Sequence, residues 1–331
     1  MTDQLLPLVF EPLLLEKPWG GWRLSKLLHK TLAGEQPIGE SWELVSLPEA
    51  ESRVRGGPFN DFSLEELVTK RTRAVVGGVA LVDGRFPLLI KFLDARENLS
   101  VQVHPRPAAD DPLGFRPGIK HEAWYVVQAE PGAELLIGLK PGVTPADVAD
   151  SAGTPRIAEL LQHWPARAGQ CYYLPSGTPH ALGAGVLVAE VQTPSDITYR
   201  LYDWERRGLN GRPRELHIDE GLRNIRFDVN PADILQADSA GGAAVRRVLT
   251  CQRFVIDERR FGLRPIAEFN VGRMHIWMVL EGTGVFSAAA GDCPIRIGDT
   301  VLIPAQMGAV DLKIDAPLRL LDITVPAADS T

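Results

Sequence analysis

The chain has 331 residues, of which 45% are apolar and 23% charged, proportions that are typical of a soluble globular protein. Acidic residues outnumber basic ones by 42 to 35, so the formal net charge is −7. This balance excludes a global role in binding nucleic acid or an anionic membrane, although a local basic pocket for a phosphate remains compatible with it. The length is enough for two sizeable domains.

Three cysteines and the apolar runs bear on the compartment. Cys171, Cys251 and Cys293 are odd in number, widely spaced and free of any CxxC pair, which predicts reduced thiols rather than a disulfide frame. The apolar run at residues 5–10 is short and has neither a basic leader nor a cleavage site. No run approaches the length of a membrane span. We therefore expect a cytoplasmic protein with no nucleic-acid or membrane partner.

The N-terminal part predicts strands, turns and one helix. Residues 7–60 are rich in proline, glycine and short apolar runs, which favours strands and turns over helices. Ser63 followed by Glu66 has the spacing of a capping box and predicts that a helix starts there. Residues 87–93 then read as a strand in which Lys91 shares a face with two leucines.

Residues 99–104 form the first stretch that contains candidate ligands. The apolar residues share one face of the expected strand, whereas Ser100, Gln102 and His104 share the other. In a barrel, the apolar face would pack outward against a second layer. The polar face would then place an amide and an imidazole inside, where these groups need a ligand.

Residues 120–127 form the second such stretch. Lys120, Glu122 and Trp124 share one face of the expected strand. Beyond it, three segments have helical spacing and predict short helices, at residues 144–147, 156–164 and 213–225.

Residues 169–204 carry the richest set of chemical side chains. A glycine, five residues, a proline and a second glycine predict a short strand and a tight turn, which puts His180 at the head of the next strand. Residues 186–192 alternate and place Glu190 in mid-strand, where its carboxylate either faces solvent or lines a cavity. Arg200 follows after a turn. The imidazole, the acid and the guanidinium together predict one wall of an active site.

The C-terminal part repeats this pattern faintly. Residues 298–304 have the same spacing of glycine and proline as residues 169–175, but Ala309 stands where His180 would fall. His275 occupies the place of the candidate carboxylate. We interpret the tail as a second barrel that has lost its ligand set, and His275 as a structural histidine.

Two imidazoles, one carboxylate and one amide oxygen form the candidate metal site: Gln102, His104, Glu122 and His180. Such a set suits Zn²⁺ with an open position, although Fe²⁺, Mn²⁺ or Co²⁺ could also occupy it. A neutral amide leaves more positive charge on the metal, which helps to polarise a substrate oxygen. The structural alternative is that each residue is an ordinary hydrogen-bonded core residue.

The other polar and aromatic candidates also have structural interpretations. Lys91 and Lys120 could be solvated lysines at a strand edge, and Glu190 and Arg200 could form a mutual salt bridge with no chemical role. We expect the tryptophans Trp19, Trp42 and Trp124 to be core residues rather than a platform for stacking sugars.

The spacing of these residues resembles a known family. QxH, then a glutamate, then GxxxxxPxGxxH is similar to the cupin barrel. More specifically, six motifs in order resemble type I mannose-6-phosphate isomerase in its shorter bacterial form, at residues 18–21, 39–43, 99–105, 122–125, 175–180 and 198–204. The resemblance extends from about residue 10 to 225 and continues more weakly toward the C-terminus.

The resemblance implies a fold and an activity. The fold would be mainly β, with two cupin (jelly-roll type) barrels and a few short helices inserted or linking them. Residues 1–240 would be the catalytic, metal-binding domain, and residues 241–331 a degenerate cupin-like domain without metal ligands. The activity would be that of a zinc-dependent aldose–ketose isomerase, with one zinc per chain, that interconverts mannose 6-phosphate and fructose 6-phosphate through a cis-enediol.

The resemblance also implies roles by position. Zinc would be held by Gln102, His104, Glu122 and His180. The polar catalytic positions would be Lys120, Glu190, Asp196 and Arg200, with Arg200 as the catalytic arginine, while Lys91 and Ser100 would lie near the substrate. Two departures stand out: His121 replaces the small residue or proline of many members, and most of the helical domain of the long forms is missing. The residues that anchor the phosphate are therefore left open.

Other functions remain compatible with the sequence. A non-haem iron dioxygenase would use similar ligands but would not require Lys120 and Arg200. A sugar-binding bicupin would hold metal and ligand without turnover. An isomerase of another aldose, including an unphosphorylated one, would differ only in substrate, and the sequence leaves protein partners unknown.

Overall fold

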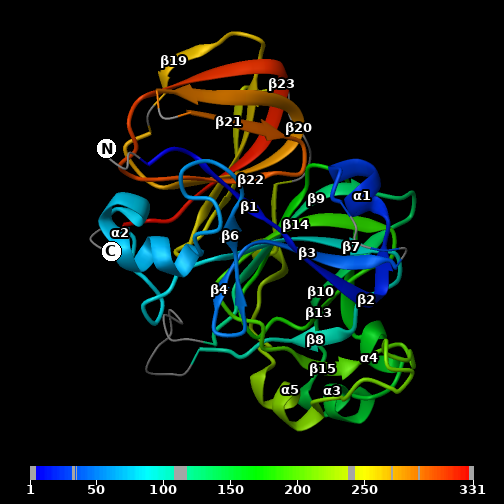
Figure 1. Ribbon diagram of the computed structural model, residues 1–331. Helices are drawn as coiled ribbons and strands as arrows, with labels where there is room; N and C mark the ends of the chain where they lie inside the picture. The colour runs from blue at the N-terminus through cyan, green and yellow to red at the C-terminus, as the bar shows by residue number, and fades with distance from the viewer. Residues whose placement is uncertain are drawn as a thin grey trace.

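The computed structural model describes residues 5–31, 34, 36–107, 118–237, 243–269, 271–289 and 291–327. These residues form mostly antiparallel β-sheets, with few helices (Figure 1). The mainly β fold class predicted from the sequence is confirmed. Within the described residues, no helix has the length and apolar character needed to cross a membrane.

A seven-stranded sheet carries most of the candidate site. Its order is β16-β12-β9-β14-β7-β2-β3. The strands are β2 (Leu13–Gly21), β3 (Ile38–Leu44), β7 (Leu89–Ala95), β9 (Glu122–Ala129), β12 (Cys171–Leu174), β14 (Val186–Gln192) and β16 (Leu235–Ala237). The strand predicted at residues 186–192 is thus confirmed. In β14, Leu187, Ala189 and Val191 face one hydrophobic cluster and Val186 and Val188 face another, as strict alternation requires.

A five-stranded sheet lies opposite, in the order β11-β10-β13-β8-β15. Its strands are β8 (Val101–Val103), β10 (Glu134–Leu139), β11 (Leu161–Pro165), β13 (His180–Leu182) and β15 (Tyr199–Tyr202). Apolar side chains from both sheets share one core, which includes Trp124 of β9 and Leu182 of β13. The two sheets therefore form the walls of a cup. His180 begins β13, as the turn before it predicts.

Short helices cover the outer face of the five-stranded sheet. They are α3 (Pro145–Ser151), α4 (Arg156–Glu159) and α5 (Ile218–Asn224). Val101 and Val103 of β8 pack against apolar residues of these helices, so these two residues face outward as expected. Leu99, which we expected on the same face, belongs instead to the core between the two sheets and borders the pocket, because it precedes the regular strand. Other short elements are α1 (Arg23–Leu28), the 3₁₀ turn η1 (Pro231–Asp233) and the hairpin of β4 (Ser46–Leu47) and β5 (Ala50–Glu51).

A third, nine-stranded sheet contains the C-terminal strands and two strands from the N-terminal part (Figure 1). They are β1 (Leu8–Glu11), β6 (Arg53–Val54), β17 (Val245–Thr250), β18 (Val255–Phe261), β19 (Ile266–Phe269), β20 (His275–Ala288), β21 (Gly291–Arg296), β22 (Thr300–Ile303) and β23 (Val310–Thr324). Leu8 pairs with Leu302. The back face of the seven-stranded sheet shares a core with this sheet. The division at residue 240 and the second closed barrel stay predictions.

Helix α2 (Leu64–Val76) starts where the sequence predicts. The Ser63 side chain accepts a hydrogen bond from the Glu66 backbone N–H, and the Glu66 side chain accepts one from the Ser63 backbone N–H. These are the two reciprocal bonds of a capping box, which satisfy donors that would otherwise lack partners at a helix start.

Three further local expectations differ from the structure. The helix expected over residues 213–225 begins only at Ile218, because Pro213 forms an isolated β-bridge with Arg207 instead. Residues 23–28 form a helix within a segment for which we expected strands and turns. The helix expected over residues 156–164 ends at Glu159, and β11 follows and pairs with β10. Beyond Glu159, pairing with a neighbouring strand outweighs the helical spacing of the apolar residues.

Candidate active site

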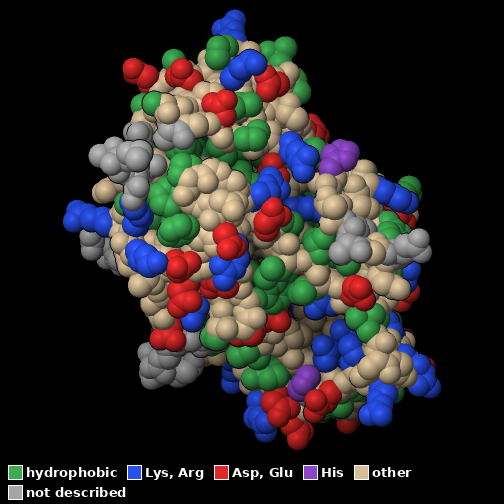
Figure 2. Space-filling model, viewed as in Figure 1, with side chains coloured by type: hydrophobic (Ala, Val, Ile, Leu, Met, Phe, Trp, Pro, Cys, Tyr) green, Lys and Arg blue, Asp and Glu red, His purple; other side chains and the backbone are tan. Residues whose placement is uncertain are grey.

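A polar pocket of about 230 Å³ opens between the two walls of the cup. Its lining consists mainly of charged and polar side chains: Lys17, Glu40, Lys91, Ser100, Gln102, Lys120, Glu190, Asp196, Thr198, Arg200 and Arg214, with Trp19, Leu93, Leu99 and Trp124. In the space-filling view, basic side chains gather beside a hollow over β8 and β15 (Figure 2). The pocket therefore combines the polar residues that the sequence places on separate strands.

Three candidate ligands converge at one end of this pocket. The ligand atoms of His104, Glu122 and His180 all lie within 4.8 Å of one another. Glu122 Oε2 is 3.2 Å from His104 Nε2 and 3.4 Å from His180 Nε2. All three side chains are at most 2% exposed. Two nitrogens and a carboxylate oxygen form a donor set that suits a divalent transition metal.

Backbone carbonyls fix which nitrogen of each imidazole faces the cluster. His104 Nδ1 donates to the carbonyl of Ile197, and His180 Nδ1 donates to the carbonyl of Thr178, each at 2.8 Å. A carbonyl oxygen can only accept, so the lone pair of each ring lies on Nε2, the atom that faces Glu122. Burial lowers the pKa of His104 and lowers that of His180 to about 4, so both rings are neutral near pH 7, as metal binding requires.

Glu122 supplies the negative charge of the cluster. Burial raises the pKa of this carboxyl, but His104 and Lys120 outweigh it, and the pKa lies well below its ordinary value. Lys120 Nζ is 2.5 Å from Glu122 Oε1 and 3.4 Å from His104 Nε2. The Lys120 contact is an ion pair, and neither Glu122 oxygen accepts a hydrogen bond of ordinary geometry. A buried carboxylate with unused lone pairs fits a position beside a cation.

Gln102 reaches the cluster from β8. Its Nε2 lies 3.3 Å from His180 Nε2, and its Oε1 accepts a hydrogen bond of 3.0 Å from the Ser100 hydroxyl. Gln102 would need its amide turned by 180° to offer oxygen to a metal. Its role as a ligand therefore stays a prediction, while Ser100 is placed to hold either orientation of the amide.

One row of side chains crosses four strands of the seven-stranded sheet. Trp42 of β3 pairs with Lys91 of β7, which pairs with Glu190 of β14, which pairs with Trp124 of β9. Residues directly opposite each other in a sheet point to the same face. The row therefore lines the cup, and the lysine and the glutamate face each other there.

Glu190 is a buried acid whose pKa is displaced upward. Its Oε1 accepts a hydrogen bond of 2.8 Å from the Trp124 indole N–H, and its Oε2 lies 3.9 Å from Lys91 Nζ. Burial, opposed by Lys120 and Lys91 and assisted by Glu122, raises the pKa of Glu190 to about 7. An acid with this pKa exchanges protons readily near neutral pH. Glu190 makes no salt bridge with Arg200 among the described contacts. The structural alternative, in which these two residues only pair with each other, therefore does not apply.

Lys91 is surrounded by carboxylates. Its ammonium lies 3.2 Å from Asp196 Oδ1, 3.7 Å from Glu40 Oε2 and 4.3 Å from the centre of the Trp42 ring. The side chain is 3% exposed, so Lys91 is not a solvated edge lysine. Glu40 also pairs with Lys17 at 2.9 Å. Although burial raises the pKa of Glu40, Lys91 and Lys17 lower it to about 2, so Glu40 is a permanent carboxylate.

Two arginines line the opposite wall. Arg200 of β15 donates to the carbonyl of Glu215 at 2.7 Å, and its buried Nε has no hydrogen-bond partner among the described residues. Arg214 makes a bidentate pair with Asp203. Burial lowers the pKa of Arg200, and the neighbouring positive charge of Arg214 lowers it further. Two cations held close together by separate partners favour an anion beside them.

The structure thus brings together every site residue that the sequence singles out. The pocket also contains residues to which we assigned no role in the site: Lys17, Trp19, Glu40, Thr198 and Arg214. Glu40 and Trp19 lie within two of the six motifs that resemble the family, so their place in the sequence could have indicated a role in the site. Arg214 lies outside all six motifs, so nothing in the sequence pattern indicates a role for it in the site. The tryptophans Trp19, Trp42 and Trp124 are at most 5% exposed, as expected of core residues, although two of them border the pocket.

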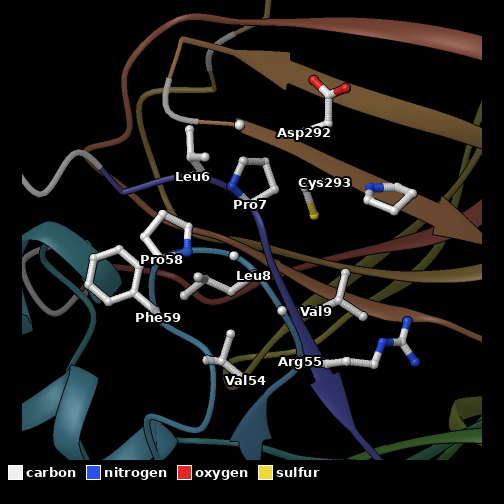
Figure 3. Close-up of a pocket in the computed structure, with 14 residues that line it drawn as sticks. Leu6, Pro7, Leu8, Val9, Val54, Arg55, Pro58, Phe59, Asp292 and Cys293 are labelled. Carbon is white, nitrogen blue, oxygen red and sulfur yellow. The ribbon is translucent and has the colours of Figure 1, made fainter.

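Another cavity, of about 260 Å³, lies away from the cup (Figure 3). Leu6, Pro7, Leu8, Pro58 and Phe59 give it a largely apolar wall. Its Arg55 is paired with Asp299, and burial raises the pKa of its Cys293 thiol to about 12. Among the described residues, this cavity has no group of metal-ligating side chains. The polar pocket is the better candidate for chemistry.

His275 has the structural surroundings that we expected. It is 4% exposed, and its Nδ1 lies 2.6 Å from Asp322 Oδ1. Among the described residues, the search for metal-ligating groups returns the cup cluster alone. The C-terminal sheet therefore offers no second group of this kind in the part of the chain that the structure describes.

The fold and the site define a cupin-type β protein with a buried group of metal-ligating side chains beside a polar pocket. The family model of phosphomannose isomerase type I, catalytic domain, matches residues 8–140. The mannose-6-phosphate isomerase of Streptococcus mutans is 36% identical over 90% of this chain and 92% of its own length. The chain belongs to the type I phosphomannose isomerase family.

Solved structures agree with this assignment. The crystal structure of the mannose 6-phosphate isomerase from Bacillus subtilis superposes with a TM-score of 0.81 at 30% identity, covering 96% of this chain and 99% of that one. A mannose 6-phosphate isomerase bound with zinc and yttrium has a TM-score of 0.71 at 20% identity, with 96% of this chain and 99% of that one covered, which shows a shared fold. The resemblance seen in the six motifs is confirmed.

Proposed function

We propose that the protein is a zinc-dependent isomerase that interconverts mannose 6-phosphate and fructose 6-phosphate through a cis-enediol. The observation that carries the proposal is the placement of His104, Glu122 and His180 beside a pocket that also holds an acid of pKa about 7, Glu190. Membership of the family supports the same substrate pair, since relatives that match over nearly the whole chain are mannose-6-phosphate isomerases.

The metal site fits a zinc ion by its chemistry. His104 and His180 offer neutral Nε2 atoms, Glu122 offers a carboxylate without hydrogen bonds, and Gln102 offers an amide at the edge of the cluster. Zinc takes nitrogen and oxygen donors of this kind and leaves a position open in catalytic sites. When bound, it would supply fixed positive charge for the oxygens of the sugar carbonyl and of the enediol.

The reaction requires a base that moves one proton between neighbouring carbons. We assign this role to Glu190, which would take the proton from C2 of the aldose, so that the C2–H electrons form the C1–C2 double bond of the enediol. The π electrons of the C1 carbonyl would move to O1, which takes up the proton of the C2 hydroxyl. The electrons left on O2 would then form the ketone at C2, while the C1–C2 double-bond electrons take the proton back from Glu190 at C1. The Trp124 indole fixes one carboxylate oxygen at 2.8 Å and leaves the other for the substrate.

Lys120 would stabilise the negative charge that develops on the substrate oxygens. Its ammonium lies between the cluster and the pocket, and burial, outweighed by Glu122, Glu190 and Asp196, leaves its pKa above the ordinary value. Lys120 therefore stays charged at working pH. A fixed charge where an oxyanion forms is among the largest contributions that a site makes to catalysis. Asp196, which pairs with Lys91 at 3.2 Å, would hold that part of the wall in place.

We place the phosphate of the substrate at the arginine wall. Arg200 and Arg214 both line the pocket, and the Arg200 Nε has no partner among the described residues. The sheet wall opposite has three ammonium groups, and each is already paired with a carboxylate: Lys17 with Glu40, Lys91 with Asp196 and Lys120 with Glu122. This wall therefore suits sugar hydroxyls instead. Planar guanidinium groups are well suited to phosphate oxygens.

Replacing Arg200 with alanine is expected to lower kcat/KM for mannose 6-phosphate at least about tenfold, because a preorganised charge is lost from the pocket. Zinc content should stay that of the wild type, since Arg200 makes no contact with the metal cluster. A fall in kcat would assign Arg200 to the reacting oxygens, and a rise confined to KM would assign it to the phosphate. Arg223→Ala is the matched control, because Arg223 is a surface residue of α5 with 69% side-chain exposure. Turnover and affinity both near normal would remove Arg200 from the site.

A coupled isomerase assay tests the proposal directly. Mannose 6-phosphate, mannose and glucose 6-phosphate are offered to the zinc-loaded protein with and without a chelator. We expect turnover of mannose 6-phosphate alone, abolished by the chelator and restored by Zn²⁺. Turnover of free mannose at a comparable rate would contradict the phosphate assignment, and saturable binding of mannose 6-phosphate without turnover would contradict the enzymatic one.

A further inference from the structure

The chain takes an uncommon backbone conformation immediately after β15. Trp204 has a φ of 57° and Glu205 a φ of 55°, in the left-handed region that residues with a side chain rarely occupy. Two such residues in succession form a strained turn, and strain of this kind persists only where the surrounding contacts hold it.

Three contacts hold the turn. The Trp204 indole N–H donates to the carbonyl of Leu99 at 2.6 Å, and Arg206 Nη1 donates to the carbonyl of Asn98 at 2.7 Å. The Arg206 backbone N–H donates to the carbonyl of Asp203 at 3.1 Å. Residues 98 and 99 lie just before β8, whose Gln102 borders the metal cluster. The turn is thus fastened to the wall of the cup.

Asp203 lies at the base of the loop that follows the turn. Its Oδ1 accepts hydrogen bonds from Arg206 Nη2 at 2.7 Å and from Arg214 Nη2 at 2.5 Å, and its Oδ2 accepts one from Arg214 Nε at 2.7 Å. The carboxylate therefore joins the two ends of the segment at residues 206–214. Asp203 is 5% exposed, whereas Arg214 lines the pocket. The bidentate pair fixes the plane of the Arg214 guanidinium, not only its position.

We propose that Asp203 is a positioning residue that holds Arg214 against the pocket, so that its guanidinium meets the phosphate of the substrate. The proposal rests on the proposed function, which places the phosphate at this wall. It gives the strained turn a purpose, because the chain reverses at residues 204–205 between Asp203 and the two arginines that its carboxylate binds, Arg206 and Arg214. Asp203 itself touches neither substrate nor metal.

Charge alone makes the opposite prediction. Asp203 is a buried negative charge close to the phosphate subsite, and its removal would strengthen the attraction between Arg200, Arg214 and an anion. If the field at the pocket were decisive, loss of this carboxylate would improve phosphate binding. If the orientation of Arg214 is decisive, the loss weakens binding. The direction of the change therefore separates a positioning role from a purely electrostatic one.

The test is Asp203→Asn, which keeps the shape of the side chain and removes its charge. We expect KM for mannose 6-phosphate and the inhibition constant of inorganic phosphate to rise at least about tenfold, since a misplaced binding group can cost that much or more. We expect kcat to change less than about threefold. Asp228→Asn is the matched control, because Asp228 pairs with Arg226 on the surface with 74% side-chain exposure. An unchanged or lowered KM and inhibition constant would overturn the proposal.

Further variants keep the test decisive if Asp203→Asn folds poorly. Glu205→Gly accommodates the positive φ at little cost and is expected to raise Tm by about 1–2 °C, so it provides a more stable background for Asp203→Asn. Arg214→Lys keeps the charge but loses the bidentate pair, and it is expected to raise KM in the same way.

A direct binding measurement separates this proposal from the proposed function. Calorimetry with inorganic phosphate compares the wild type with Asp203→Asn without any turnover. If the wild type fails to isomerise mannose 6-phosphate, the proposed function fails, while weaker phosphate binding by the variant would still support the role of Asp203. Equal phosphate binding by both proteins would refute that role even in an active isomerase.

Discussion

Replacing His104 with alanine is expected to abolish the metal content of the purified protein and to lower kcat/KM for mannose 6-phosphate by at least about 10²-fold. Loss of a partner that only orients a ligand commonly costs 10–100-fold in affinity or activity, so loss of a ligand costs at least as much. The remaining His180 and Glu122 would leave two protein donors of the three that lie within 4.8 Å of one another. Zinc per chain, measured by atomic absorption, is the primary readout.

A matched variant separates metal binding from general damage. His163→Ala removes an exposed imidazole whose Nδ1 lies 2.8 Å from Glu134 Oε2, outside the pocket. It should keep both zinc and activity. Stoichiometric zinc in the His104→Ala protein would refute the ligand assignment, and with it the assignment of the cup as a metal site.

Replacing Glu190 with glutamine is expected to lower kcat by about 10²–10⁴-fold, because a general base contributes on this order. Glutamine keeps the length of the side chain and can still accept the hydrogen bond from Trp124, so folding and zinc content should be retained. The control is Glu281→Gln, which removes a carboxylate paired with Arg319 on the surface with 57% side-chain exposure. A kcat within threefold of the wild type would assign the proton transfer to another group.

The pH dependence gives a second readout for the same residue. Burial raises the pKa of Glu190 to about 7, and a base acts only in its ionised form, so activity should be present above the pKa and should fall as the pH drops through it. Positive charge at the metal cluster lowers this pKa, so the acid limb of the zinc-loaded enzyme should lie at or below about pH 7. The Glu190→Gln variant should lack this limb, as measured from kcat/KM against pH.

The sequence predicts the cup site well because strand geometry is local. In β8, alternation alone places Gln102 on the inner face and Val101 on the outer one, and the structure has both there. The turn before His180 fixes that residue at the start of β13 in the same local way. Alternation within a strand does not predict which strands pair with each other. That part came from the motifs of a known family.

The features that the sequence does not predict depend on long-range contacts. The helical spacing at residues 156–164 is real, but pairing of β11 with β10 overrides it beyond Glu159. Arg214 lies in a loop outside every motif, and neither its bidentate pair with Asp203 nor its place in the pocket is marked by a local pattern. Glu40 becomes a permanent carboxylate only because Lys17 and Lys91 arrive from other strands. In each case the decisive partner is remote in the chain or unmarked by any pattern.

The pairing of β1 with β22 has a consequence for synthesis of the protein. Leu8 pairs with Leu302, so β1 cannot pair with β22 until the long stretch of chain between them has been synthesised. Until then, the apolar back of β9 and β14 has no cover from the C-terminal strands and stays open to solvent. Contacts between residues that are far apart in the chain form slowly, and uncovered strands are prone to aggregation in the interval. A nascent chain therefore covers the back of its cup only after the C-terminal strands have been made.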